Sequence, residues 1–185
     1  MYKRIYLVLI GGIFFCFYTA SLAAEEIVGK YFTLVCFSGC DRSEFAYKIN
    51  ANYLLQRDIE YSPATPDSII AKSLDALYLD VSDILDIHIY SYHGKIVVYP
   101  TRQALKEDVF RNFEGQKPDL PSLYIHSTDT IFISLADMTM PMLAHEMAHA
   151  IMSHYFVVPP PAKIQEVLAG YVEYSIRKST GTLPH

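Results

Sequence analysis

The spacing of apolar and polar positions predicts two helices in the first half of the chain. The first begins with a capping box from Asp41 to Glu44 and continues to about Arg57, with apolar side chains at helical spacing. The second begins at Thr65, because the proline that follows is favoured in the first turn of a helix, and its apolar face extends to Leu85. Before both helices, the aromatic and β-branched segment 31–37 predicts a strand.

The middle of the chain changes to a pattern that is typical of strands. Segments 87–92 and 95–99 flank a His-Gly pair, which predicts a hairpin or one bent strand. Thr101 is predicted to cap a short helix that reaches Phe113, and a polar loop follows. Segments 123–126 and 130–135 are then predicted to be short strands joined by a turn.

The last third of the chain is predicted to be helical. Asp137 or Thr139, followed by Pro141, starts a helix that runs to about Phe156. Three prolines at 159–161 interrupt the chain, and a final helix covers about residues 162–178. The order of elements predicts an α+β fold, in which a small mixed β-sheet is followed by two consecutive helices.

The first 24 residues have the pattern of an export signal. Lys3 and Arg4 precede an apolar run to about Tyr18, and small residues close the segment before Glu25. An uncleaved membrane anchor is the alternative, because the apolar run is almost long enough to cross a bilayer. Cleavage is favoured, after Ala23 or Ala24, and residues 25–185 are expected to form one periplasmic or secreted domain.

The charge of the chain argues against nucleic acid as a partner. The formal net charge is −5, and it becomes −7 without residues 1–24, which contain two basic residues and no acidic ones. An acidic domain without a basic stripe is unsuited to binding phosphate backbones. We therefore expect no nucleic-acid partner, and contact with a membrane only if the leader is retained.

The cysteines fit an exported protein. Cys16 would be removed with the leader, which leaves Cys36 and Cys40 in an oxidising compartment. We expect these two to form a local disulfide. A redox or metal-binding pair is the alternative, although the spacing differs from that of thioredoxins and no second pair of cysteines is present to complete a zinc site.

Residues 145–149 read His-Glu-Met-Ala-His inside a predicted helix. His145 and His149 are one turn apart on one face, so both imidazoles can bind one metal ion. Zinc lowers the pKa of a bound water to about 7, and Glu146 is placed to act on that water as a general base. The alternative is a buried helix that contains two histidines by coincidence. The apolar residues around the motif favour a metal, because buried polar groups need partners.

A catalytic zinc site needs a third protein ligand and one open coordination position. His154 faces away from the two histidines, so we place it outside the ligand set. Glu166 on the final helix is the better candidate, because small residues at 169 and 170 would let that helix approach closely. Glu173 lies further along the same face, and it is predicted either to replace Glu166 or to hold a zinc-binding histidine in place.

The HExxH motif, together with the later segment around Glu166, resembles the pattern of a known family. The segment HEMAHAIMSHYF, the proline-rich break and the segment IQEVLAGYVEY resemble the gluzincin branch of the zincin metallopeptidases, the thermolysin-like peptidase MA superfamily. The resemblance covers about residues 87–178 and implies a zinc-dependent peptidase. It implies His145, His149 and Glu166 as zinc ligands and Glu146 as the base. Where the family usually has Glu-Gly, this chain has Glu166-Val167.

The resemblance also implies how a peptide would be hydrolysed. The peptide would pair with an edge strand around Ile131–Ile133, and Glu146 would activate the zinc-bound water and later protonate the leaving amine. A phenol could stabilise the oxyanion, and Tyr171 is the candidate beside Tyr174 and Tyr155. The main alternative is a non-catalytic zinc protein of the same fold that acts as a binding or assembly factor. A structural exported domain without metal is a further alternative.

Overall fold

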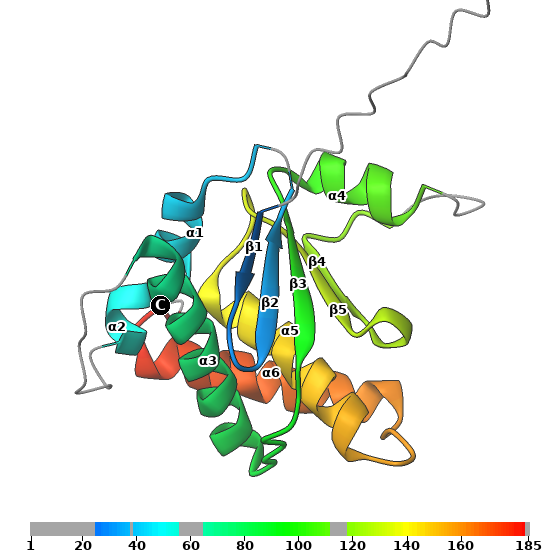
Figure 1. Ribbon diagram of the computed structural model, residues 1–185. Coiled ribbons are helices and arrows are strands. Elements are labelled where there is room, and N and C mark those ends of the chain that lie inside the picture. The colour runs from blue at the N-terminus through cyan, green and yellow to red at the C-terminus, as the bar shows by residue number, and fades with distance from the viewer. Residues whose placement is uncertain (1–24, 38, 56–64, 112–117, 184–185) are drawn as a thin grey trace, which may run out of the picture.

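A five-stranded mixed sheet lies at the centre of the part of the chain that the computed structural model describes, which comprises residues 25–37, 39–55, 65–111 and 118–183 (Figure 1). The predicted export signal lies outside these residues. The strand order is β1-β2-β3-β5-β4, in which β2, β3 and β5 are parallel and the two outer strands are antiparallel to their neighbours. The strands are β1 (Glu25–Val28), β2 (Phe32–Cys36), β3 (Gly94–Tyr99), β4 (Ser122–Ile125) and β5 (Thr130–Ser134).

The hairpin predicted for residues 87–99 is wrong. Residues 87–92 form no strand, because β3 is already paired on both sides by parallel neighbours. Tyr92 instead lies beneath the start of β3, where a Cβ atom on Gly94 would collide with its phenol. A glycine is therefore required at the point where the chain enters the sheet.

The strand predicted to be the sheet edge is also different. The segment around Ile131–Ile133 belongs to β5, which lies between β3 and β4, so the prediction that a peptide pairs there is wrong. Ile131 and Ile133 are fully buried, as expected for an inner strand with one face on the core. The terminal strand of the sheet on this side is β4.

The helices begin where the sequence indicates. Asp41, Thr65, Thr101 and Thr139 each cap a helix by accepting a hydrogen bond from a backbone N–H in the first turn. The helices are α1 (Arg42–Lys48), α2 (Ala51–Leu55), α3 (Pro66–Leu85), α4 (Arg102–Val109), α5 (Met140–Tyr155) and α6 (Ala162–Ser179), and a 3-10 turn, η1, covers His126–Thr128.

The first predicted helix is divided in two. Asn50 has a φ of 51°, a left-handed conformation that ends α1, and α2 starts at the next residue. Asparagine tolerates this conformation better than most residues do. The predicted end near Arg57 lies outside the described residues.

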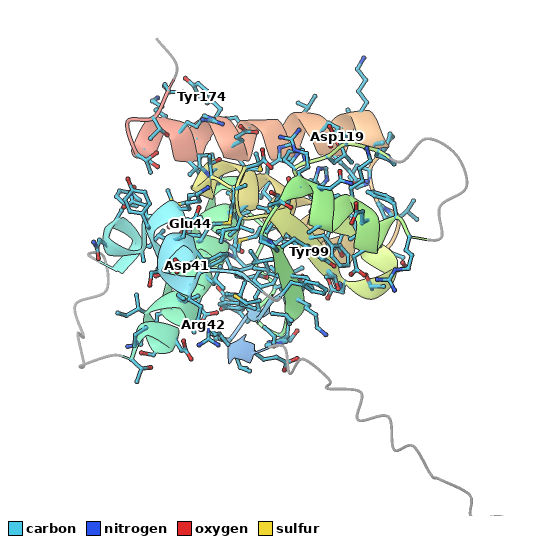
Figure 2. All side chains as sticks on the ribbon, turned by 90° about the horizontal axis from the view of Figure 1, so that it is seen from above. Asp41, Arg42, Glu44, Tyr99, Asp119 and Tyr174 are labelled. Atoms are coloured by element: carbon cyan, nitrogen blue, oxygen red, sulfur yellow. The ribbon has the colours of Figure 1, made fainter. Side chains whose placement is uncertain are left out.

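Three helices form the layer that positions the functional residues. Helix α5 contacts β4 and β5, and it also contacts α3, which packs on β1 and β2, and α6, which has few contacts with the sheet, so α5 lies between the sheet and α6. Figure 2 shows α6 along one side of the molecule. Helix α5 is buried on nearly all sides, which explains its long apolar sequence: Met140, Leu143, Ala144, Met147, Ala148, Ala150, Ile151 and Met152 are all buried. The predicted α+β fold class is confirmed.

The contact of α6 with this layer uses one of the two small residues that the sequence singled out. Ala169 is fully buried beside Val172 and Ile176, whereas Gly170 is exposed and has no neighbour in the direction of a side chain.

None of the helices in the described segments has the length and apolarity needed to cross a bilayer.

Candidate metal centre

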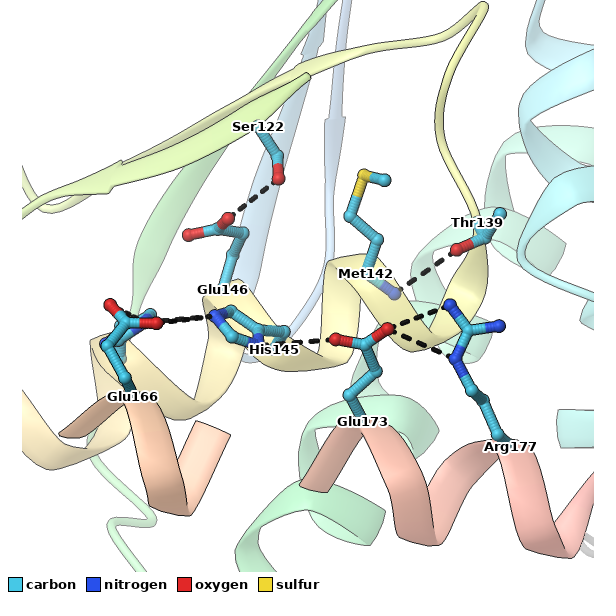
Figure 3. A network of polar contacts seen from close by, with 9 residues as sticks. Ser122, Thr139, Met142, His145, Glu146, Glu166, Glu173 and Arg177 are labelled. Atoms are coloured by element: carbon cyan, nitrogen blue, oxygen red, sulfur yellow. Dashed lines mark hydrogen bonds and ion pairs between the residues drawn. The ribbon is translucent and has the colours of Figure 1, made fainter. Parts of the chain in front are cut away.

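Three side chains from two helices converge on one point. His145 and His149 are one turn apart on α5, and their Nε2 atoms are 3.2 Å apart. Glu166, in the second turn of α6, places one carboxylate oxygen 3.6 Å from Nε2 of His145 and the other 3.5 Å from Nε2 of His149. Figure 3 shows Glu166 and His145 facing each other across the gap between the helices.

The distances between these atoms fit tetrahedral zinc. Zinc–nitrogen and zinc–oxygen bonds of about 2.0–2.2 Å place neighbouring ligand atoms of a tetrahedron roughly 3.3–3.6 Å apart. The two Nε2 atoms, 3.2 Å apart, lie within about 0.1 Å of this range. Glu166 brings a different carboxylate oxygen to each imidazole, at 3.6 and 3.5 Å, and one ligand atom from each of the three residues lies within 4.8 Å of the other two. Within the described segments, no other group of three His, Cys, Asp or Glu side chains converges in this way. The residues therefore fit a metal with two imidazole ligands and one carboxylate ligand.

Glu173 occupies the other side of His145. Its carboxylate lies 3.5 Å from Nδ1 of His145, a buried nitrogen with no hydrogen-bond partner within the usual limits. Arg177 donates two hydrogen bonds, of 3.1 and 2.8 Å, to the Glu173 carboxylate (Figure 3). Glu173 therefore does not replace Glu166. It occupies the position of a carboxylate that orients a metal-binding histidine.

Glu146 points towards the sheet and away from α6. Its carboxylate accepts a 2.7 Å hydrogen bond from the hydroxyl of Ser122 on β4, and the backbone N–H of Tyr124 also stabilises it. Only 7% of Glu146 is exposed, and this burial raises the pKa of its carboxyl group. The hydrogen bond from Ser122 and the nearby His145 partly oppose that rise.

Burial has the opposite effect on His149. It lowers the pKa of the imidazole, and neighbouring His145 lowers it further, while Glu166 partly opposes the change. A lowered pKa favours the neutral imidazole near pH 7. Only the neutral form can act as a metal ligand, so this environment favours binding.

A cleft of about 530 Å³ opens beside these residues. His145, Glu146, His149 and Glu166 all line it, and the segment that contains β4 forms the facing wall. The remaining lining residues are Leu120, Ser122, Leu123, Tyr124, His126, Ser153, Pro159, Ala162 and Gln165. The cleft therefore brings the candidate metal ligands and the candidate base to the same space as the terminal strand of the sheet.

The structure does not bring Tyr171 to the cleft. Tyr171, Tyr174 and Tyr155 are each at least half exposed, and none of them lines the cleft. Tyr171 lies on the outer side of α6 because it follows Glu166 by five residues, which turns it well away from the metal side. The expectation that Tyr171 contacts the reacting group is therefore not supported.

Sequence reasoning missed the polar side chains that β4 contributes to the cleft. Ser122 and Tyr124 alternate on the face of β4 that meets α5, and His126 follows just after the strand. The alternation of Ser, Tyr and His was visible in the sequence, but it became informative only once the strand's neighbour was known.

His154 lies outside the candidate ligand set, as predicted. Its Nε2 is 3.4 Å from a carboxylate oxygen of Asp129, and its ring contacts Tyr92. Tyr92 and Tyr124 donate hydrogen bonds to the same carboxylate. This cluster joins the last turn of α5 to the turn between β4 and β5, so it supports one wall of the cleft.

The two cysteines lie side by side, as the predicted disulfide requires. Their sulfur atoms are 3.0 Å apart, and the thiol of Cys40 donates a hydrogen bond to Cys36. A disulfide bond is about 2.05 Å long, so the structure describes two thiols in contact and the disulfide stays a prediction. The hydrogen bond with Cys36, together with burial, raises the pKa of the Cys40 thiol.

The buried pair of Ser122 and Glu146 can be tested without any assay of function. Ser122→Ala is expected to lower the free energy of unfolding by about 1–3 kcal/mol, because the buried carboxylate loses a donor. Urea denaturation measures the change, and Ser127→Ala in the exposed η1 turn is the control with little expected effect. The loss should be smaller in a Glu146→Ala background. An equal loss in both backgrounds would contradict the pairing.

Comparison with known proteins identified no relative of this chain. A scan against models of protein families and searches among curated proteins and among solved structures found no match to the chain.

Proposed function

We propose that this chain is an exported zinc-dependent metallopeptidase. The observation that carries the proposal is the convergence of His145, His149 and Glu166 at distances suited to tetrahedral zinc, with buried Glu146 beside them. Three protein ligands leave a fourth position open, which distinguishes a catalytic zinc site from a structural one. The resemblance of residues 87–178 to gluzincins supports the same assignment.

The chemistry is divided between the metal and the residues around it. When bound, zinc would supply Lewis acidity, which lowers the pKa of a coordinated water and polarises a carbonyl group. Glu146 would take a proton from the attacking water and pass it to the leaving amine. Its raised pKa suits this exchange, because a base whose pKa lies nearer neutrality can also return the proton. Ser122 would hold the carboxylate in position during both steps.

The wall of the cleft supports an extended peptide as the substrate. Strand β4 ends the sheet, and among the residues that the structure describes only β5 pairs with it, along one of its two edges. A peptide can add to a free strand edge through main-chain hydrogen bonds. We therefore place substrate pairing on β4 and not on Ile131–Ile133. Ser122, Leu123 and Tyr124 line the cleft beside the candidate metal ligands, so a peptide bound there would lie near Glu146.

Metal analysis tests the foundation of the proposal. Protein expressed from the full sequence is expected to bind about one zinc per chain, and His145→Ala/His149→Ala is expected to bind none. The matched control is His88→Ala/His93→Ala, in which two exposed histidines remote from the cleft are replaced. Elemental analysis after dialysis gives the stoichiometry. If the protein binds no zinc even when zinc is supplied, the proposal is wrong.

The contact between the Glu173 carboxylate and His145 leads to a separate prediction. Glu173→Gln is expected to weaken zinc binding by about 10–100-fold, because the neutral amide orients His145 less firmly and makes its imidazole less basic. Competition with a chelator of known affinity measures the change. Glu107→Gln on α4 replaces an exposed glutamate remote from the site and should leave the affinity unchanged. Equal zinc affinities for Glu173→Gln and the wild type would contradict the role of Glu173 in orienting His145.

Glu146→Gln separates catalysis from metal binding. The variant is expected to keep its zinc and to lose about 10²–10⁴-fold in hydrolysis, because an amide cannot accept the proton. A peptide-library digest followed by mass spectrometry detects the products, and zinc content is measured on the same samples. Full activity in this variant would contradict the role of Glu146. Zinc-loaded wild type without hydrolysis of any peptide would favour the non-catalytic binding or assembly factor.

A further inference from the structure

The exposed apolar side chains of the described residues are concentrated in one short stretch of the sequence. Thirteen large apolar residues are exposed, and seven of them lie within the 20 residues from Tyr155 to Tyr174. Scattered single residues of this kind are normal on a protein surface, but a cluster marks an interaction site. The cluster comprises Tyr155, Val157, Val158, Ile164, Val167, Tyr171 and Tyr174.

The cluster has two parts that adjoin each other. Val157 and Val158 lie in the connection from α5 to α6, with exposures of 101% and 81%, so nothing in the described structure covers them. The other part is the outer face of α6, which we define by Ile164, Val167, Tyr171 and Tyr174. Their spacing of three and four residues places them on one side of the helix. Figure 2 shows Tyr174 directed away from the body of the protein.

The charges of α6 are divided between its two sides. Both acidic residues, Glu166 and Glu173, face His145 on the inner side, where Arg177 pairs with Glu173. Lys163 and Lys178 are exposed, and their positions in the helix place them beside the apolar stripe, near its two ends. The outer face of α6 is therefore apolar and basic, in a chain whose formal net charge is −5.

This distribution of charge argues against a second copy of the chain as the occupant. If two α6 helices paired antiparallel, Lys163 of one copy would lie near Lys178 of the other. If they paired parallel, each lysine would meet its own equivalent. Like charges oppose each other in both arrangements, and the outer face offers no acidic residue to compensate.

A lipid surface matches every feature of the cluster. Tyrosine is favoured at the boundary between lipid and water, and lysine extends its ammonium group towards anionic headgroups. Aliphatic side chains on an exposed loop can enter the apolar layer below the headgroups. We propose that the outer face of α6, together with Val157 and Val158, binds the surface of a bilayer that contains anionic lipid.

This surface adjoins the cleft. Pro159, which directly follows Val158, and Ala162, two residues before Ile164, both line the cleft. Binding through the outer face of α6 would therefore hold the mouth of the cleft close to the lipid surface. The proposal does not depend on zinc or on hydrolysis, so it can be tested whether or not the proposed function is correct.

The absence of tryptophan from the chain allows a site-specific test. In full-length Val158→Trp, the fluorescence emission is expected to shift to shorter wavelength when phosphatidylglycerol vesicles are added, because the indole leaves water. The shift should be weaker with phosphatidylcholine vesicles. Tyr47→Trp, at an exposed position on α1, is the control, and its emission should not shift. The local reporter also separates this face from any effect of residues 1–24, and mass spectrometry establishes whether those residues are present.

Charge reversal tests the basic part of the surface. Lys163→Glu/Lys178→Glu in the Val158→Trp background is expected to lower the partition coefficient for phosphatidylglycerol vesicles by roughly tenfold or more. The proposal is overturned if Val158→Trp shifts with neither vesicle, or if Tyr47→Trp shifts equally. It is also overturned if the shift grows with protein concentration in the absence of lipid, because self-association would then cover the surface.

Discussion

The close contact between α5 and α6 is the constraint on which the candidate site depends. Two histidines on α5 and two glutamates on α6 meet at this contact, although α5 is surrounded almost entirely by apolar groups. Such polar side chains destabilise an apolar layer unless they find partners. Each glutamate faces a different nitrogen of His145, which fixes the ring in one orientation. Burial of Ala169 lets the helices approach, because a larger side chain there would hold them apart.

Strand β4 also holds the site in place, from the side of α5 that faces the sheet. Helix α5 presents its histidines to α6 and Glu146 to the sheet, so the base and the candidate ligands are held by different elements. The buried hydroxyl of Ser122 donates a hydrogen bond to the Glu146 carboxylate and so favours its orientation towards the sheet. The cluster around Asp129 joins the turn after β4 to the end of α5. The strand and the helix are therefore fixed to each other at both ends of the cleft.

Features that depend on residues close together in the sequence, such as helix caps, could be predicted from the sequence. Features that depend on which elements pack together in space could not. The caps at Thr65, Thr101 and Thr139 are local hydrogen bonds, so the residue types alone indicate them. The spacing of His145 and His149 is likewise a property of one helix. The order of the strands is not local, because a buried segment such as 130–134 has the same pattern wherever it lies in the sheet. Tyr171 is close to Glu166 in sequence, but an offset of five residues on one helix turns it to the opposite side, so its residue type alone does not place it in the cleft.

Helix α6 carries both the side that meets the histidines and the outer apolar side, so the requirements of both surfaces act on the sequence of one helix. Its inner side holds Glu166 and Glu173 against α5, while its outer side carries an apolar stripe between two lysines. A soluble helix of this kind normally buries one apolar side and exposes polar residues on the other. Here both sides are apolar in part, and the acidic residues have been confined to the side that meets the histidines. An acidic residue on the outer side would increase solubility at no cost to the site. Its absence along the whole length of the helix therefore points to a requirement of the outer surface, and not of the metal centre.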